Sequence, residues 1–114
     1  MSISFVVAES IEPAELAENA VEYSDEAQEF LRKNKQMFNG NIEILVRLDP
    51  YCDTCILNNE INLVKEAAQL IQDTLKSLSE LNDILEELLD FTELITEFCN
   101  KAINNEQCLI VIGD

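Results

Sequence analysis

The sequence predicts an α/β domain in which a small three-stranded, largely parallel sheet is packed with helices in the order β-α-α-β-α-α-β. Three short apolar segments, residues 3–8, 42–48 and 108–112, have the composition of strands. Two helical segments lie between each strand and the next, and helical crossovers favour parallel neighbours with right-handed connections. The 114 residues contain no linker and no internal repeat, so residues 1–114 are expected to form a single domain.

The N-terminal third is expected to contain one strand and two helices. Residues 3–8 are apolar and partly β-branched, as in strands that are buried on both faces. A first helix of about 8 to 10 residues is expected to begin at Pro13, where a proline is tolerated, and to reach Val21. Ser24 is a favourable N-cap for a second helix over residues 25–38.

The middle of the chain is expected to contain a second strand followed by an amphipathic helix. Gly40 is placed to end the preceding helix with a positive φ. Residues 42–48 are half alternating, which predicts a strand with one partly exposed face. A helix is expected from about Asn58, because apolar residues recur there at spacings of four and three: Leu57, Ile61, Val64, Ala68, Ile71, Leu75 and Leu78.

The C-terminal part is expected to contain another long helix and the central strand. Ser77 and Glu80 fit a capping box, which predicts that the helix restarts there and runs to about Asn104. An unbroken helix over residues 57–104 would be about 70 Å long, too long for a compact domain, although a coiled-coil hairpin is the alternative. Residues 108–112 are apolar throughout, as in a strand buried on both faces.

The charge of the chain is its most unusual property. It has 23 acidic and 7 basic residues and no histidine, for a formal net charge of −16. Such a protein repels phosphate backbones and anionic membranes, so nucleic-acid and membrane binding are not expected. A cationic protein partner would be attracted and steered from a distance. The alternative is that the charge serves solubility alone.

The acids fall into two groups that are candidates for binding a partner. Between Lys76 and Lys101 there are seven acids and no base: Glu80, Asp83, Glu86, Glu87, Asp90, Glu93 and Glu97. A second acidic helix face is predicted within residues 12–29, and it includes Glu15, Glu18 and Glu22. Like charges three or four residues apart destabilise a helix, so a retained acidic ridge fits a cation-binding face. A solvated outer face is the alternative interpretation.

Cys52 and Cys55 form the one short motif with possible chemistry. The segment from Pro50 to Cys55 resembles a glutaredoxin active site, and this resemblance implies a thiol redox function. The resemblance does not extend further, because no later proline and no β-hairpin follow. Asp53 is expected to disfavour the thiolate.

A zinc site is the other use considered for this pair. Cys99 and Cys108 would complete a four-thiolate set. Their spacing is unlike that of a second C-x-x-C, and packing in the core explains both more simply. We therefore expect no metal and no other cofactor.

The usual catalytic motifs are also missing from the sequence. Without histidine, the usual nucleophilic triad cannot form. Gly40 and Gly113 are the only glycines, too few for a glycine-rich phosphate loop. The sequence thus favours a binding protein over an enzyme.

The overall plan resembles small acidic bacterial immunity proteins of the contact-dependent growth-inhibition type. The likeness lies in the N-terminal strand at residues 3–8, the acidic helices, and a last helix leading into an apolar strand over residues 98–112. Residues 99–112 are also similar to the end of barstar-type ribonuclease inhibitors. The resemblance implies a cytoplasmic, non-enzymatic inhibitor that covers the active-site cleft of a basic toxin domain, a nuclease above all. The absence of a basic, apolar leader at the N-terminus agrees with a cytoplasmic location. A helical scaffold or oligomer, driven by the apolar stripe over residues 57–78, is a further alternative.

Overall fold

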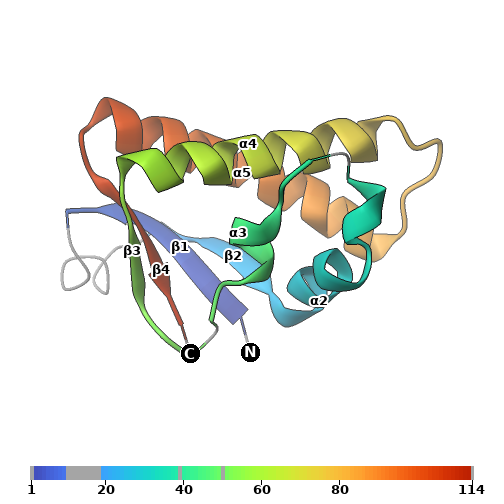
Figure 1. The fold of residues 1–114 in the computed structure, drawn as a ribbon, viewed down its shortest axis with the longest axis horizontal. Coiled ribbons are helices and arrows are strands. Elements are labelled where there is room, and N and C mark those ends of the chain that lie inside the picture. The colour runs from blue at the N-terminus through green and yellow to red at the C-terminus, as the bar shows by residue number, and fades with distance from the viewer. Residues whose placement is uncertain (1, 10–18, 39, 50, 114) are drawn as a thin grey trace.

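The computed structural model describes residues 2–9, 19–38, 40–49 and 51–113, and these form an α/β fold around a four-stranded antiparallel sheet (Figure 1). The strands are β1 (Ser2–Ala8), β2 (Val21–Ser24), β3 (Thr54–Ile56) and β4 (Cys108–Ile112). Their order across the sheet is β2-β1-β4-β3, and every neighbouring pair is antiparallel.

The predicted three-stranded, largely parallel sheet is therefore wrong, and two unpredicted edge strands are part of the reason. β2 includes Val21, which was expected to end a helix. Val21 and Tyr23 are buried and Glu22 between them is exposed, an alternation typical of a strand. The alternation extends over only the four residues of β2, and a helix begins directly after Ser24. Asn19 and Ala20, also expected in that helix, belong to no helix or strand, and the part of the predicted helix before Asn19 lies outside the described residues.

The strand predicted over residues 42–48 is also wrong, because a four-residue helix, α3 (Glu43–Val46), stands there. Ile42, Leu45 and Val46 are the buried residues, and their spacing of three and four is helical. The β-branched composition of the segment led to the opposite prediction. The buried Tyr23 hydroxyl donates to the Leu45 carbonyl at 2.9 Å, which fixes this turn against the sheet.

The second predicted helix exists but is shorter than expected. α2 (Asp25–Lys33) begins as predicted, with the Ala27 N–H donating to the Ser24 hydroxyl at 3.1 Å. A 3₁₀ turn, η1 (Lys35–Met37), replaces its last part. Gly40 has the expected positive φ of 158°, and a Cβ at this position would come within 2.4 Å of Leu70.

Both long helices are confirmed. α4 (Asn58–Lys76) and α5 (Asp83–Asn104) pack on each other and on one face of the sheet (Figure 1). The restart predicted at Ser77 is wrong, because Ser77 donates back to the Thr74 carbonyl at 2.6 Å. The N-cap of α5 is Asn82, whose side-chain oxygen accepts from the Leu85 N–H at 3.0 Å.

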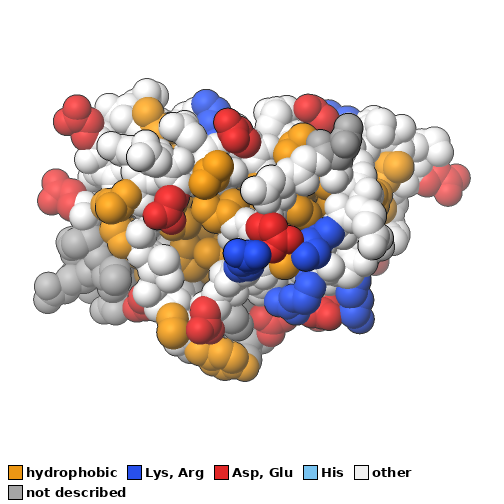
Figure 2. Space-filling model, in the orientation of Figure 1, with side chains coloured by type: hydrophobic (Ala, Val, Ile, Leu, Met, Phe, Trp, Pro, Cys, Tyr) orange, Lys and Arg blue, Asp and Glu red, His pale blue; other side chains and the backbone are white. Residues whose placement is uncertain are grey.

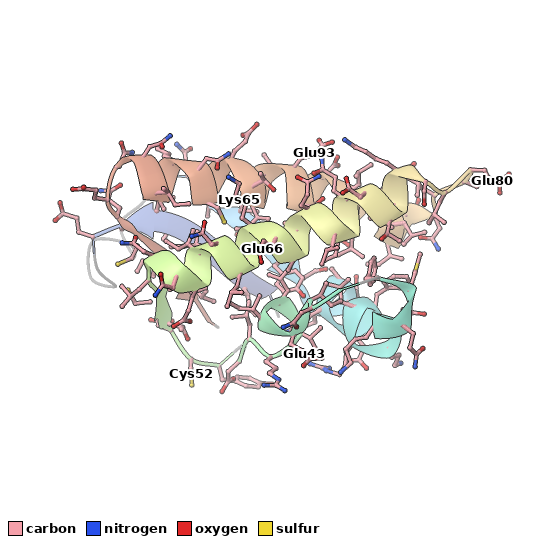
Figure 3. All side chains as sticks on the ribbon, turned by 45° about the horizontal axis from the view of Figure 1, so that its top comes forward. Glu43, Cys52, Lys65, Glu66, Glu80 and Glu93 are labelled. Carbon is pink, nitrogen blue, oxygen red and sulfur yellow. The ribbon has the colours of Figure 1, made fainter. Side chains whose placement is uncertain are left out.

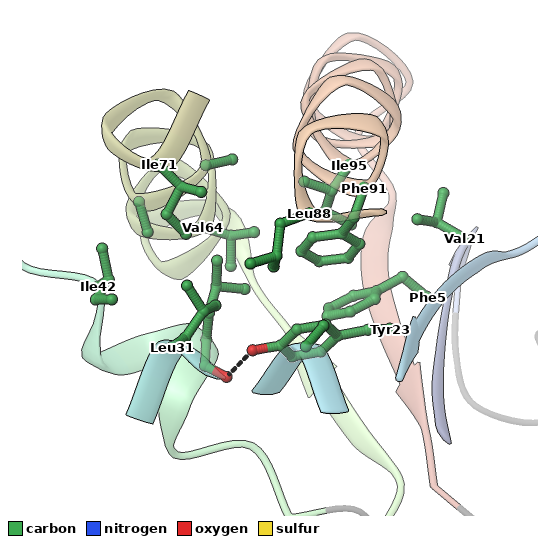
Figure 4. Close-up of a cluster of buried hydrophobic side chains, with 14 of the residues drawn as sticks. Phe5, Val21, Tyr23, Leu31, Ile42, Val64, Ile71, Leu88, Phe91 and Ile95 are labelled. Atoms are coloured by element: carbon green, nitrogen blue, oxygen red, sulfur yellow. Dashed lines mark hydrogen bonds between the residues drawn. The ribbon is translucent and has the colours of Figure 1, made fainter. Parts of the chain in front are cut away.

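The core lies between the sheet and the two long helices. Phe91 of α5 stacks on Tyr23 with ring centroids 4.6 Å apart, and Phe5 of β1 lies 5.7 Å from Phe91 (Figure 4). Gln28 is buried, and its amide donates to the carbonyls of Leu45, Val46 and Leu48. These contacts join α2, α3, the sheet and α5 into one body.

The opposite face of the sheet carries a second, smaller apolar cluster. It is formed by Val6, Ala8 and Ile110, with Cys55, Cys108 and Ile112 packed at its edge. The two central strands contribute buried residues to both faces, as their largely apolar sequences predicted. Within the described ranges, no helix combines the length and the apolar character needed to cross a membrane.

Candidate functional site

The seven acids predicted between Lys76 and Lys101 lie together on one side of α5 and in the connection before it. All seven side chains are exposed. We call this surface the α5 acidic face, formed by Glu80, Asp83, Glu86, Glu87, Asp90, Glu93 and Glu97. Figure 3 shows Glu93 on the outer side of α5 and Glu80 at the tip of the α4–α5 connection. Glu86 and Glu97 are separated by about 16 Å along the helix axis.

The position of this face follows from the residues that α5 buries. The buried side of the helix consists of Leu85, Leu88, Phe91, Thr92, Ile95, Cys99 and Ala102. The ridge formed by residues 86, 90, 93 and 97 is on the opposite side, as the helical period requires. The sequence pattern therefore places these carboxylates in solvent. A location in solvent also fits the alternative interpretation, a solvated outer face. Whether these carboxylates have cation partners therefore bears on the choice between the two interpretations.

Part of the positive charge is gathered elsewhere on the molecule, where it is already paired. Glu29 of α2 contacts Arg32 and also Lys33, the latter at 3.7 Å. Glu43 of α3 contacts Lys35 at 2.8 Å and Arg47 at 3.0 Å. Figure 2 shows these blue side chains grouped below the middle of the view. Four of the 7 basic residues thus lie at this α2–α3 end.

The α5 acidic face lacks such compensation. Across the described ranges 2–9, 19–38, 40–49 and 51–113, none of the ion pairs includes a carboxylate of this face. By contrast, the side-chain hydrogen bond from Lys35 lowers the pKa of Glu43, and the charges of Lys35 and Arg47 act in the same direction. The molecule thus has one end with paired carboxylates and one helix face without cation partners.

The second predicted acidic group is not brought together as one helix face. Glu15 and Glu18 lie outside the described residues. Glu22 belongs to β2, not to a helix, and its carboxylate accepts a hydrogen bond from the Ser4 hydroxyl at 2.9 Å. It therefore points to the side of the sheet opposite the helices, away from α5.

The arrangement of Cys52 and Cys55 differs from that of a thioredoxin-like site. Cys52 is exposed, and its thiol donates to the Asp49 carboxylate at 3.4 Å. This hydrogen bond and the charges of Asp49 and Asp53 raise the pKa of Cys52. A redox-active thiol needs the opposite shift. Asp53 acts as the sequence suggested, and Asp49, which sequence reasoning missed, has the larger effect.

The four cysteines do not converge on a metal site. Cys99 is fully buried in α5, as the core-packing interpretation predicted, and burial raises its pKa to about 12. Cys55 and Cys108 lie on the opposite side of the sheet. In the part of the chain that the structure describes, no three or more Cys, Asp or Glu residues are placed to hold a metal ion.

Two surface hollows lie near the start of α5 and near Cys108. One, of about 660 Å³, is formed by α2 and the start of α5, with Phe30 and Ile84 in its lining. The other, of about 510 Å³, lies between the first turn of α4 and the turn before β4. Its lining includes Leu57, Glu60 and Cys108.

Comparison of the chain with protein-family models, with curated proteins and with solved structures gives no match. The function must therefore be argued from the charges and contacts of the molecule.

Proposed function

We propose that this protein is a non-catalytic inhibitor whose α5 acidic face docks on the basic cleft of a toxin nuclease domain, in the manner of an immunity protein. One observation carries the proposal: seven exposed carboxylates share one helix and its lead-in, and none has a cation partner among the described residues. A nuclease cleft presents Lys and Arg to phosphates, so it complements such a face.

Repulsion between the carboxylates of this face reduces the local stability of α5. Glu86, Asp90, Glu93 and Glu97 are successive neighbours at four, three and four residues, and each such like-charge pair costs about 0.2–0.5 kcal/mol. Asp83 and Glu86 gain from the helix dipole in the first turn. Glu93 and Glu97 lie beyond that turn and gain nothing from it. A cationic partner would remove this repulsion on binding.

The face is also held rigidly and contains an apolar anchor. The stacking of Phe91 on Tyr23 fixes α5 against the sheet, so little ordering cost remains for binding. Leu94 is 47% exposed and lies between Asp90 and Glu97 on the same side of the helix. An exposed apolar residue among charges supplies contact area at the centre of an interface, while the carboxylates steer the approach.

The test compares two neutralised variants that carry the same net charge. The face variant combines Glu86→Gln, Asp90→Asn, Glu93→Gln and Glu97→Gln. The matched control combines four exposed acids elsewhere: Glu9→Gln, Glu26→Gln, Glu60→Gln and Glu66→Gln. Each set removes four negative charges, which changes the formal net charge from −16 to −12.

Immobilised wild-type protein, face variant and control are used to capture proteins from bacterial lysates that express candidate toxin nuclease domains. We expect the wild type and the control to retain a basic nuclease domain and to suppress its cleavage of nucleic acid. The face variant should lose both properties. Equal capture by the face variant, or capture without inhibition of cleavage, would contradict the proposal.

A further inference from the structure

Cys55 and Cys108 lie next to each other on the face of the sheet opposite α4 and α5. In the β3–β4 pair, Cys55 is opposite Ile110, so Cys108 is its diagonal neighbour on the same face. Both thiols pack against the cluster of Val6, Ala8 and Ile110. The Cys108 thiol also donates a hydrogen bond to the Glu9 carbonyl at 3.7 Å.

The structure thus pairs Cys55 with a cysteine far away in the sequence and separates it from Cys52. Cys52 lies in the turn before β3, and Asp49 accepts the hydrogen bond from its thiol. Cys55 is inside β3, with its side chain directed into the apolar cluster around Ile110. The two cysteines of the C-x-x-C motif thus make different contacts, and the neighbour of Cys55 in the sheet is Cys108.

A small reagent can reach this pair through one of its members. Cys108 lines the hollow of about 510 Å³ beside the first turn of α4. Both thiols are half-buried, and Cys108 is the one of the two that lines this hollow. The geometry therefore makes Cys108 the thiol that a reagent meets first.

We propose that Cys55 and Cys108 form an oxidisable dithiol that a low-molecular-weight disulfide, such as oxidised glutathione, converts to an intramolecular disulfide. The Cys108 thiolate attacks one sulfur of the reagent and releases one small thiol, leaving a mixed disulfide on Cys108. Cys55 then loses its proton to solvent, attacks the Cys108 sulfur and releases the second small thiol. Two protein thiols are oxidised to one disulfide, and the reagent is reduced to two thiols.

The disulfide would join an edge strand to the centre of the sheet. β3 has three residues and, among the described residues, pairs only with β4. Diagonal positions are about 7–8 Å apart, beyond the separation that a disulfide spans, so β3 must shift toward β4, which its position at the edge of the described sheet allows. Oxidation would then restrict opening of β3 and of the turn that carries Tyr51 and Cys52.

The test treats the reduced, folded protein with oxidised glutathione and maps the linkage by blocking free thiols, digestion and mass spectrometry. We expect a Cys55–Cys108 link with loss of two hydrogens and no retained glutathione. Cys52→Ser should not change this result, whereas Cys55→Ser should stop the reaction at glutathionylated Cys108. Because the linkage is read in the wild-type chain, the test does not depend on the folding of a variant.

The pH dependence supplies a second readout. Burial and the neighbouring Cys108 thiol raise the pKa of Cys55 to about 11, and the charge of Glu60 acts in the same direction. Closure of the mixed disulfide should therefore accelerate roughly tenfold per pH unit below that value, because the Cys55 thiolate is the attacking species. A Cys52–Cys55 disulfide, a mixed disulfide that persists on Cys108 at alkaline pH, or four thiols that stay reduced would each overturn the proposal.

Discussion

The α2–α3 end and the α5 acidic face differ in whether their carboxylates form ion pairs with cations among the described residues. At the α2–α3 end, Glu29 and Glu43 each contact two cations. Along α5, carboxylates follow one another without a cation partner among the described residues. Solubility depends on net charge and requires no such segregation. The arrangement of the charges, more than their amount, is therefore the basis of the proposed binding function.

The largest expected effect concerns the buried side of α5, on which the acidic face depends. Phe91→Ala removes a ring that contacts Phe5 and Tyr23, and it should lower the free energy of unfolding by about 3–5 kcal/mol. Leu94→Ala, on the exposed side of the same helix, should change it by less than about 0.5 kcal/mol. Denaturant titration measures both. Similar losses in the two variants would show that α5 is not anchored through its aromatic contacts.

The next effect concerns association, where the two charged regions should differ most clearly. Charge reversal to Lys at Glu86, Asp90, Glu93 and Glu97 should slow association with the captured nuclease domain by about 10- to 100-fold at low salt. The same reversal at Glu9, Glu26, Glu60 and Glu66 should have a much smaller effect. Stopped-flow rates over a range of salt concentrations provide the measurement. Equal slowing by both sets would mean that net charge alone steers the partner.

The sequence predicted the parts of the fold that depend on long patterns. α4 and α5 extend over many turns, so their apolar periodicity identified them, and β4 was recognised from its uniform apolar run. β2 and β3 have only four and three residues, and α3 has four. Such short segments carry too little periodicity, so tertiary contacts decide their structure. Because the missed strands are the sheet edges, the parallel topology was wrong as well.

The candidate sites show the same division. The α5 acidic face was predictable, because a helix converts a spacing of three and four residues into one surface. The thiol pair was not, because Cys55 and Cys108 meet only through the register of β3 with β4. The sequence offered Cys52 as the partner of Cys55 because the two are close along the chain. Strand alternation at Cys55, had β3 been recognised, was the one available signal.

A smaller effect tests whether the α5 carboxylates oppose local stability. Asp90→Lys replaces repulsion of Glu86 and Glu93 with attraction, and it should raise the free energy of unfolding by about 0.5–1 kcal/mol. The control is Asp73→Lys on α4, where the new lysine would stand three residues before Lys76 and should destabilise slightly. Thermal unfolding compares them. An unstable Asp90→Lys variant would mean that the carboxylate has a structural role in the free protein.

The smallest expected effect concerns Glu43 at the α2–α3 end. It is measured as a change in stability with pH. The pKa of Glu43 is lowered from 4.5 by its hydrogen bond from Lys35, by the charges of Lys35 and Arg47, and by the hydrogen bond from Arg47. A carboxyl with a lowered folded-state pKa stabilises the protein above its unfolded pKa, and this contribution disappears as pH falls through the folded value. Glu43→Gln should therefore reduce stability at neutral pH, and the difference from wild type should shrink as pH falls below 4.5 and vanish below the lowered folded-state pKa.

The same carboxyl can be followed directly in the folded protein by NMR titration. Lys35→Gln should move the pKa of Glu43 upward toward 4.5 by more than Arg47→Gln does, because the hydrogen bond from Lys35 has the largest effect. Arg47 is the more exposed of the two cations, with 79% of its side chain accessible against 46% for Lys35, so solvent weakens its pairing. Equal shifts in the two variants would show that Glu43 responds to the general positive charge of the α2–α3 end. The pKa of Glu43 would then be lowered by all nearby cations together. The contrast with α5 would depend on where cations are placed and not on individual ion pairs.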